Sequence, residues 1–463
     1  MKRFIKKKII YFFILIIIIF IVSAYFLMGK GYFSVVNKIF TTQQIQNIKE
    51  YIFPYKVITE QKKTLADLDS RRKKTFSYLF ELELKSKKNL DDIQIRKSED
   101  IKLSNNKTMS KFTIGSGFYS AIYKINPGGY IDFYENSLFL ISSRGILAYG
   151  QNLEDKNLRQ IENNLNDFIN LKQFNKSITF SLRDLLIYKN KIFISYIEEV
   201  KEDCYNTNFV YGDLDFDKIK FKKASFNKTN DCIHFSNNID NEFNGMQSGG
   251  RIVHYDDNHV LFSVGEFRNR FLAQEKENIN GKVIKVNIEN FSYEIISMGH
   301  RNPQGLYYDK KNNFIIETEH GPMGGDEINL IEISKINKEK PLNYGWAIVS
   351  AGEHYKGKVK DNKEKYRKYP LYKSHTKYGF VEPLKSFIPS IGISEVTKIG
   401  NNKFVVSSMK DKSLYFFELD NKKEIQNLER VEVFERVRDL KFHNDKLYLF
   451  LEEPASIGVI SFN

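Results

Sequence analysis

Cysteine is scarce in this chain, and this leaves little room for cysteine-based chemistry. The 463 residues contain two cysteines, Cys204 and Cys232, with no Cys-x-x-Cys pair and no histidine at a metal-binding spacing. A metal or redox site built on them is therefore disfavoured. We expect a single structural disulfide outside the cytoplasm, with two buried free thiols as the alternative.

The sequence also lacks the features of a nucleic-acid-binding protein. Lys and Arg outnumber Asp and Glu by 71 to 57, a formal net charge of +14, and such an excess favours acidic partners in general. Five of the positive charges lie in the first eight residues, however, and no recognition helix or RNA-binding motif is visible. We expect no nucleic-acid partner.

Residues 9–28 carry no charged side chain. At about 1.5 Å per residue, a helix of this length spans roughly the 30 Å hydrocarbon core of a bilayer. A cleavable signal peptide is the alternative, but its apolar region is usually about 7–15 residues long. The preceding basic residues favour a cytoplasmic N-terminus. We therefore expect a single-pass protein of the cell inner membrane, with the chain after residue 30 on the periplasmic side.

The sequence as a whole divides into three predicted parts, with boundaries near residues 29 and 107. Residues 1–29 form the predicted basic tail and transmembrane anchor. Residues 30–107 are heavily charged with a thin apolar stripe, which predicts a helical stalk or linker. Residues 108–463 carry short alternating strands and form the predicted main domain.

The main domain contains a repeated hairpin. Six segments share one layout, a strand of about six residues, a polar turn and a second strand, and they begin at Ile131, Asp184, Ile252, Gly305, Glu395 and Asp439. Their spacing is too irregular for a solenoid and suits a ring of four-stranded blades. We predict an all-β fold, a six-bladed β-propeller, with one or two β-sandwiches as the alternative. The segment from Lys111 and the final ASIGVISF are expected to share a blade and close the ring.

Basic residues stand close to the ends of these repeats. In a propeller such ends meet near the central channel, so the residues together predict a positive pocket for a ligand with several carboxylates or phosphates. The alternative is that about half of them are ordinary surface charges. The set is Arg183, Arg251, Arg301, Lys410, Lys412, Arg436 and Arg438.

Residues 299–331 hold the most unusual combination of side chains. Arg301 and Asn302 before a proline offer a guanidinium fork and an amide, which suit a planar ligand bearing carboxylates. Gly321 and Pro322 end a strand with little side-chain bulk, so their carbonyl oxygens are free to bind a hard cation such as Ca²⁺. Asp326 is expected either to support this loop or to bind a second ion.

The motifs GHRNPQGL, ETEHGPMGGDEINLI and NYGW, in this order, resemble the glucose/sorbosone dehydrogenase family. The family includes soluble quinoprotein glucose dehydrogenase and bacterial aldose sugar dehydrogenases, and the resemblance covers about residues 128–463. It implies a six-bladed propeller that holds pyrroloquinoline quinone (PQQ), a tricarboxylate, over a Ca²⁺ ion. Members oxidise the C1 hydroxyl of a sugar by passing a hydride to the quinone, so a small sugar or alcohol is the implied substrate.

The resemblance also implies roles for individual residues. The implied cofactor contacts are Arg301, Asn302, Lys410 and Lys412. The implied metal-binding residues are Gly321, Pro322 and Asp326.

One departure concerns the general base. Family members carry a histidine two residues before Gly-Gly-Arg, and here that position holds Gln247. An amide has no useful basicity near pH 7, and base catalysis typically supplies a factor of about 10²–10⁴. The catalytic residue is therefore left unassigned. The open hypotheses are a membrane-anchored dehydrogenase, a propeller that binds a cofactor, glycan or protein partner without catalysis, and an extracytoplasmic scaffold.

Overall fold

The computed structural model describes residues 54–89, 92–115, 128–177, 179–226, 232–238, 242–337, 340–355 and 363–462, with the single residues 15, 16, 23, 44, 47, 51, 118 and 240. Most of the predicted anchor, residues 9–28, lies outside this set. Within the described residues, no helix combines the length and the apolar character needed to cross a membrane.

Residues 1–74 and 75–463 form two separate compact parts. The long helix α4 (Pro54–Asn89) begins in the first part and ends in the second. Proline suits the first turn of a helix because its missing N–H would have no partner there. The exposed surface of α4 carries ion pairs one turn apart, such as Asp67 with Arg71 at 3.0 Å.

The second part is mostly β, as predicted, and its described strands fall into successive antiparallel groups. The first group is β3 (Gly129–Tyr134), β4 (Ser137–Ser142), β5 (Leu147–Gly150) and β6 (Asn157–Gln160). The second is β8 (Leu182–Tyr188), β9 (Lys191–Lys201), β10 (Cys204–Asp213) and β12 (Lys222–Lys223). The third is β14 (Gly249–Asp256), β15 (His259–Val264), β16 (Lys282–Asn287) and β17 (Tyr293–Met298).

The later groups repeat this layout. The fourth is β18 (Pro303–Asp309), β19 (Phe314–Glu319), β20 (Asp326–Glu332) and β22 (Lys385–Phe387). The fifth is β23 (Ile393–Gly400), β24 (Lys403–Ser408), β25 (Ser413–Leu419) and β26 (Ile425–Glu432). The sixth is β27 (Val437–His443), β28 (Lys446–Glu452), β29 (Ala455–Ser461) and β2 (Thr108–Ile114).

Short elements complete the described chain. Besides β12, the two-residue strands are β7 (Glu162–Asn163), β11 (Lys218–Ile219), β13 (Ile233–His234) and β21 (Leu342–Asn343). The short helices are α5 (Leu171–Lys176) and α7 (Lys363–Lys368), and the 3-10 turns include η3 (Gly245–Gln247) and η4 (Arg270–Gln274).

The first strands of the groups form a closed ring. In chain order β3, β8, β14, β18, β23 and β27 each contact the next, and β27 contacts β3. Each of the predicted hairpins corresponds to the first two strands of one group. Several of their tight turns hold Asn at positive φ, such as Asn402 at 56° and Asn444 at 47°, a conformation that Asn tolerates well.

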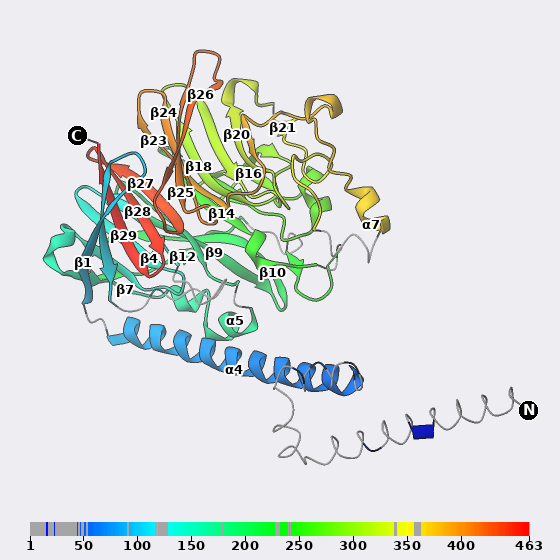
Figure 1. The fold of residues 1–463 in the computed structure, drawn as a ribbon. Coiled ribbons are helices and arrows are strands. Elements are labelled where there is room, and N and C mark those ends of the chain that lie inside the picture. Colours follow the sequence, from blue (N-terminus) through cyan, green and yellow to red (C-terminus); the bar gives the residue numbers. More distant parts are fainter. Residues whose placement is uncertain are drawn as a thin grey trace, which may run out of the picture. The chain divides into compact units, whose positions relative to one another are not determined.

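The ring is closed by strands from opposite ends of the second part. β2 pairs antiparallel with β29, with Phe112 opposite Ile457, as the sequence predicts. The blue β1 (Ile93–Lys102) and the red strands of Figure 1 belong to one sheet, in which β2 lies between β1 and β29. β1 extends this sheet by pairing with both β2 and β6, so the structure moves residues 93–102 from the predicted stalk into the sheet.

The core consists of apolar layers between neighbouring groups. Between the first two groups, Phe139, Leu185, Ile194 and Tyr205 are fully buried in one cluster. Burial of such side chains stabilises the fold by roughly 1.5–3 kcal/mol each. The groups are thereby held in a fixed order, which fixes where their connecting loops meet.

The centre of the ring contains a buried ion network. Arg251 on β14 contacts Asp184 at 2.7 Å, Asp439 at 2.8 Å and Glu395 at 2.7 Å, and these acids come from β8, β27 and β23. A buried guanidinium needs such partners because its desolvation is costly. Arg251 was predicted to belong to the positive pocket, and the structure places it in this network instead.

Candidate functional site

A cavity of about 1020 Å³ opens where the loops that precede the inner strands meet the loop between β19 and β20. Its volume lies near the upper end of the range for small-molecule sites, roughly 300–1,000 Å³. The described residues that line it include two acids, Asp326 and Glu353, and a larger set of bases. These bases are Arg183, Arg268, Arg301, Lys373, Lys410, Arg436 and Arg438.

Arg301 is buried and lines this cavity. Its Nη1 donates hydrogen bonds to the carbonyl oxygens of His320 at 2.8 Å and Gly321 at 2.7 Å, and its guanidinium lies 5.3 Å from the Trp346 ring. Burial lowers the pKa of this guanidinium because a charge loses hydration there. The neighbouring Asn302 accepts a hydrogen bond from the Gly249 N–H at 3.2 Å.

The loop of His320, Gly321 and Pro322 lies between β19 and β20, outside the strand ladder. The Pro322 carbonyl accepts a 3.4 Å hydrogen bond from the Ser390 hydroxyl, while the Gly321 carbonyl accepts from Arg301. A Cβ at Gly321 would lie 2.1 Å from the Gly325 carbonyl oxygen, so only glycine fits. Neither carbonyl oxygen is therefore held in sheet pairing, and each accepts a hydrogen bond from a side chain.

Asp326 holds this loop against the start of β23. Its carboxylate accepts hydrogen bonds from the N–H groups of Gly321 at 3.1 Å, Gly392 at 2.7 Å and Ile393 at 3.1 Å. The loop-supporting role considered for Asp326 is therefore present in the structure. Its role as a metal ligand stays a prediction.

Lys410 and Lys412, the two lysines expected to contact the cofactor, lie in different surroundings. Lys410 lines the cavity with an exposed side chain. Lys412 forms an ion pair with Glu453 and is not among the described lining residues. Arg436 and Arg438 do line the cavity, and both pair with Glu452, at 2.9 and 2.6 Å.

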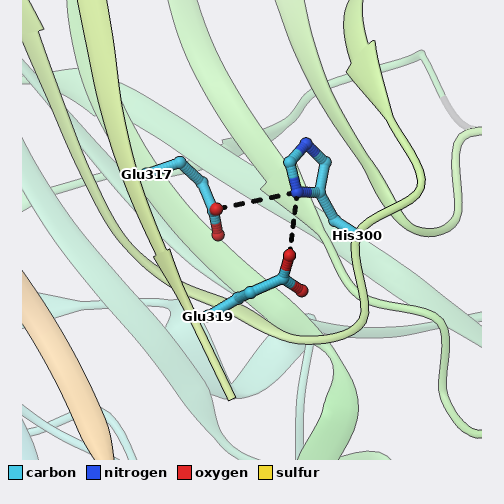
Figure 2. Close-up of side chains that lie close together, drawn as sticks. All are labelled: His300, Glu317 and Glu319. Atoms are coloured by element: carbon cyan, nitrogen blue, oxygen red, sulfur yellow. Dashed lines mark hydrogen bonds and ion pairs between the residues drawn. The ribbon is translucent and has the colours of Figure 1, made fainter. Parts of the chain in front are cut away.

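A buried histidine and two acids support the turn that carries Arg301. Figure 2 shows His300 between Glu317 and Glu319, with its Nδ1 3.6 and 3.2 Å from their oxygens. Burial and the charge of Glu319 raise the pKa of Glu317 well above its usual value. The other Glu319 oxygen accepts from the backbone N–H groups of Arg301 and Asn302, so the cluster fixes the Arg-Asn turn.

Gln247 lies in the cavity wall, at the end of η3. Its backbone carbonyl accepts from the Phe267 N–H at 2.9 Å, which fixes the turn against the end of β15. Among the described lining residues the one histidine is His320. Its pKa is lowered by burial first and by the nearby arginines, against the opposing effect of Asp326.

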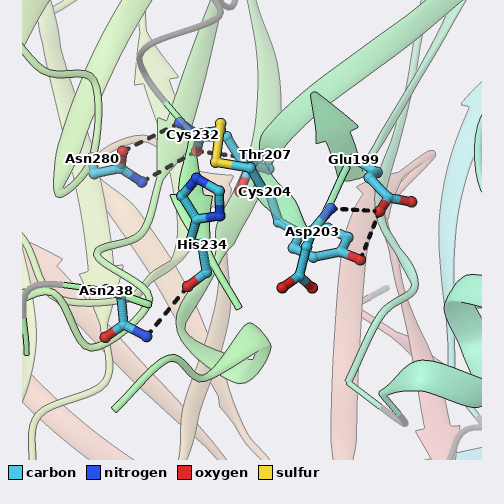
Figure 3. The surroundings of a disulfide bond; sticks show 10 residues. Glu199, Asp203, Cys204, Thr207, Cys232, His234, Asn238 and Asn280 are labelled. Atoms are coloured by element: carbon cyan, nitrogen blue, oxygen red, sulfur yellow. Dashed lines mark hydrogen bonds between the residues drawn. A yellow bond between two sulfur atoms is a disulfide. The ribbon is translucent and has the colours of Figure 1, made fainter. Parts of the chain in front are cut away.

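The predicted disulfide is confirmed, and the strand that carries Cys204 contacts the residue after Gln247. Cys204 and Cys232 are bonded, with their Cα atoms 5.3 Å apart, and Figure 3 shows the bond beside Thr207. The Thr207 hydroxyl donates a 2.6 Å hydrogen bond to the Ser248 carbonyl. The cross-linked segment therefore supports the residue that follows Gln247.

Sequence reasoning missed several lining residues. Arg268 follows the β14–β15 hairpin, and the rule that found Arg301, a basic residue at the end of a hairpin, applies to it equally. Glu353, Tyr355 and Lys373 belong to the long connection between β21 and β22. That connection has no repeat pattern, so no local signal pointed to them.

A family model of glucose/sorbosone dehydrogenases matches residues 188–459, more than half of the chain. The chain belongs to the glucose/sorbosone dehydrogenase family. It is 27% identical over 227 residues to an uncharacterized protein of Synechocystis, which covers 42% of this chain and 51% of that protein. The chain thus spans about half the length of that relative.

A better-covered relative is the aldose sugar dehydrogenase YliI of Escherichia coli. It is 25% identical over 287 residues, 57% of this chain and 71% of the relative. Among solved structures, the PQQ-bound aldose sugar dehydrogenase of Streptomyces coelicolor superposes with a TM-score of 0.54 at 14% identity, over 80% of this chain and 98% of that one. At this identity the superposition supports a shared fold.

Proposed function

We propose that this family member is an oxidoreductase that binds PQQ and Ca²⁺ in the cavity and oxidises a hydroxyl of a small sugar or alcohol. We further propose that the ring of sheets is a six-bladed β-propeller. The observation that carries the proposal is the meeting of Arg301, Asn302 and the Gly321 and Pro322 carbonyls in one positively charged cavity.

The residues present fit a planar tricarboxylate. Arg301 and Asn302 lie at one wall, and Lys410, Arg436 and Arg438 line the same cavity from the neighbouring loops. Guanidinium groups bind carboxylates through paired hydrogen bonds, which fix a planar ligand in orientation. When bound, PQQ supplies a quinone that accepts a hydride from the substrate.

The loop oxygens fit a hard cation. Ca²⁺ prefers oxygen ligands at about 2.3–2.6 Å, and carbonyls outside sheet pairing are suitable donors. The Arg301 N–H group and a cation bound at the Gly321 carbonyl would compete for the same oxygen atom. Calcium binding would therefore release an Arg301 N–H toward an anionic ligand and couple the two binding events.

Gln247 occupies the position at which family members carry the histidine that acts as general base. Its amide can position a substrate hydroxyl by hydrogen bonding but does not accept its proton near pH 7. This observation favours a second candidate function, binding of the cofactor or a sugar without oxidation.

Reconstitution separates these functions. The full chain is incubated with PQQ and Ca²⁺, the bound cofactor is followed by its absorbance, and dye reduction is measured with a panel of sugars. We expect cofactor binding, slow turnover by the native chain, and up to roughly 10²–10⁴-fold faster turnover by Gln247→His. Cofactor binding without turnover by either protein would establish the second function, and absence of cofactor binding would refute the dehydrogenase.

We also propose that residues 9–28 anchor the protein in the inner membrane with the ring on the periplasmic side. The charge-free run of twenty residues and its basic flank support this proposal. The Cys204–Cys232 disulfide supports it independently, because such bonds persist in oxidising compartments.

A further inference from the structure

The cavity holds more positive charge than the proposed cofactor requires. Seven basic side chains and two acids line it among the described residues. Glu452 offsets one further charge by pairing with Arg436 and Arg438. A tricarboxylate does not neutralise the remainder, and a bound Ca²⁺ ion adds two positive charges.

Four of these bases have no ion pair with a carboxylate in the described part of the chain. Arg183 donates to the carbonyls of Thr179 and Gly245, and Lys373 donates to that of Ala351 at 3.1 Å. Arg268 lies 5.8 Å from the Tyr355 ring, and the exposed side chain of Lys410 has no hydrogen bond or ion pair among the described residues. Burial, and then the charge of Arg438 against the opposing effect of Tyr130, lowers the pKa of Arg183 to about 10.

Two of the four lie apart from the predicted cofactor contacts along the chain. Arg268 follows β15, and Lys373 belongs to the connection that precedes β22. Phe267 and Arg268 both have positive φ, 49° and 63°. Such backbone conformations are unfavourable for bulky residues and cluster at ligand sites. The strained turn places Arg268 in the cavity wall, next to Tyr355.

We propose that the substrate is an anionic sugar, one that carries a carboxylate or a phosphate, and that Arg268 and Lys373 recognise this group. The inference rests on the proposed function because it assumes that Arg301, Asn302 and Lys410 hold the tricarboxylate, which leaves Arg268 and Lys373 for the substrate. The volume of about 1020 Å³ leaves room for a second small molecule. Tyr355 places an aromatic ring in the cavity wall beside Arg268.

Calorimetry on the full chain, reconstituted with PQQ and Ca²⁺, tests the inference with three probes: glucose, glucuronate and glucose 6-phosphate. We expect one anionic sugar to bind at least ten-fold more tightly than glucose, and the preferred one identifies the group as carboxylate or phosphate. Raised ionic strength should weaken that binding and leave glucose binding almost unchanged.

Variants locate the interaction. Arg268→Gln and Lys373→Gln should each weaken binding of the anionic sugar by roughly 10- to 100-fold, as expected for a lost charged hydrogen bond. Lys311→Gln removes the same charge from the exposed β18–β19 turn and should have no effect. An unchanged cofactor spectrum shows that each variant is folded.

The inference is overturned if glucose binds as tightly as both anionic sugars, or if neither cavity variant changes the affinity. Failure of the proposed function has a different signature, the absence of a cofactor spectrum. Oxidation of glucose with equal affinities for all probes would retain the dehydrogenase and remove the anionic substrate.

Discussion

Arg301 donates a 2.7 Å hydrogen bond to the carbonyl oxygen of Gly321, the atom at which Ca²⁺ is expected. The side chain proposed to hold the cofactor and the atom proposed to hold the metal are therefore in direct contact. Occupation of one changes the environment of the other.

Calcium and PQQ should consequently bind cooperatively. We expect removal of Ca²⁺ by a chelator to weaken PQQ binding at least ten-fold, measured by absorbance titration of the full chain. Added Mg²⁺ should restore little, because it demands a stricter octahedral geometry than Ca²⁺. Equal PQQ affinity with and without Ca²⁺ would contradict the coupling.

Substitution of Lys410 and of Lys412 by glutamine should affect PQQ affinity differently. Lys410→Gln removes a charge from the cavity wall and should weaken PQQ binding, by roughly 10-fold or more for a lost charged hydrogen bond. Lys412→Gln breaks a partly exposed ion pair with Glu453 and should leave PQQ affinity unchanged. A larger effect at Lys412 would show that its side chain reaches the cofactor.

Gly321→Ala should disrupt the metal loop while the ring stays folded. The added Cβ would meet backbone oxygens of Gly325 and Gly324 at 2.1 and 2.5 Å, so the loop must move. We expect a loss of about 1–3 kcal/mol in unfolding free energy together with loss of Ca²⁺ binding by calorimetry. Gly400→Ala is the control, because its Cβ would make only ordinary contacts, the nearest at 3.7 Å, at a position without positive φ.

Arg251→Met should be among the most destabilising single changes. It leaves the carboxylates of Asp184, Glu395 and Asp439 buried without their guanidinium. Removing one partner of a buried ion network costs about 3–5 kcal/mol, measured by urea unfolding. Arg159→Met, which breaks an exposed pair with Asp217, should cost at most about 1 kcal/mol.

The same network should make stability fall as pH rises. Burial and then repulsion by Asp439 and Asp184, against the attraction of Arg251 and Lys441, raise the pKa of Glu395 to about 8. An unfolded glutamate releases its proton near its ordinary pKa of about 4.3. Between these values the folded state holds the extra proton, so unfolding free energy should decrease from about pH 5 to pH 8.

The control for this prediction is Glu395→Gln, which removes the titrating group but keeps a similar shape. Unfolding free energies at pH 5, 6.5 and 8 should show a smaller decrease in this variant than in the native chain. Identical slopes would assign the pH dependence to other groups.

Deletion of residues 1–29 should release the protein from the membrane. We expect the native chain in the membrane fraction after washing with high salt, and the deletion variant in the supernatant with its disulfide intact. Release of the native chain by salt alone would refute the anchor.

The sequence predicted the repeated part of this molecule well because each hairpin carries its own local signal. A short apolar run next to an Asn turn specifies segments such as β24 (Lys403–Ser408) without reference to distant parts of the chain. Arg301, Asn302, Gly321 and Pro322 were found because they lie next to such hairpins, in a motif with a recognisable order.

The rest depended on long-range packing. Nothing near Lys412 in sequence shows that Glu453 will pair with it, or that Arg251 will meet acids from three other strands. β1 was assigned to the stalk because its charged residues, Ile93–Lys102, resemble the preceding helix and not a buried strand. β1 pairs with β2 and β6. The sequence of residues 93–102 alone does not show these partners.

The pairing of β2 with β29 also has a consequence for biosynthesis. While the chain emerges from the ribosome, β2 appears early and its partner appears last, so one strand edge stays open throughout elongation. Until residues 455–461 arrive, the nascent protein presents a surface that chaperones or neighbouring nascent chains can bind. A premature stop shortly before Ala455 should therefore yield an aggregating product rather than a slightly shortened folded protein.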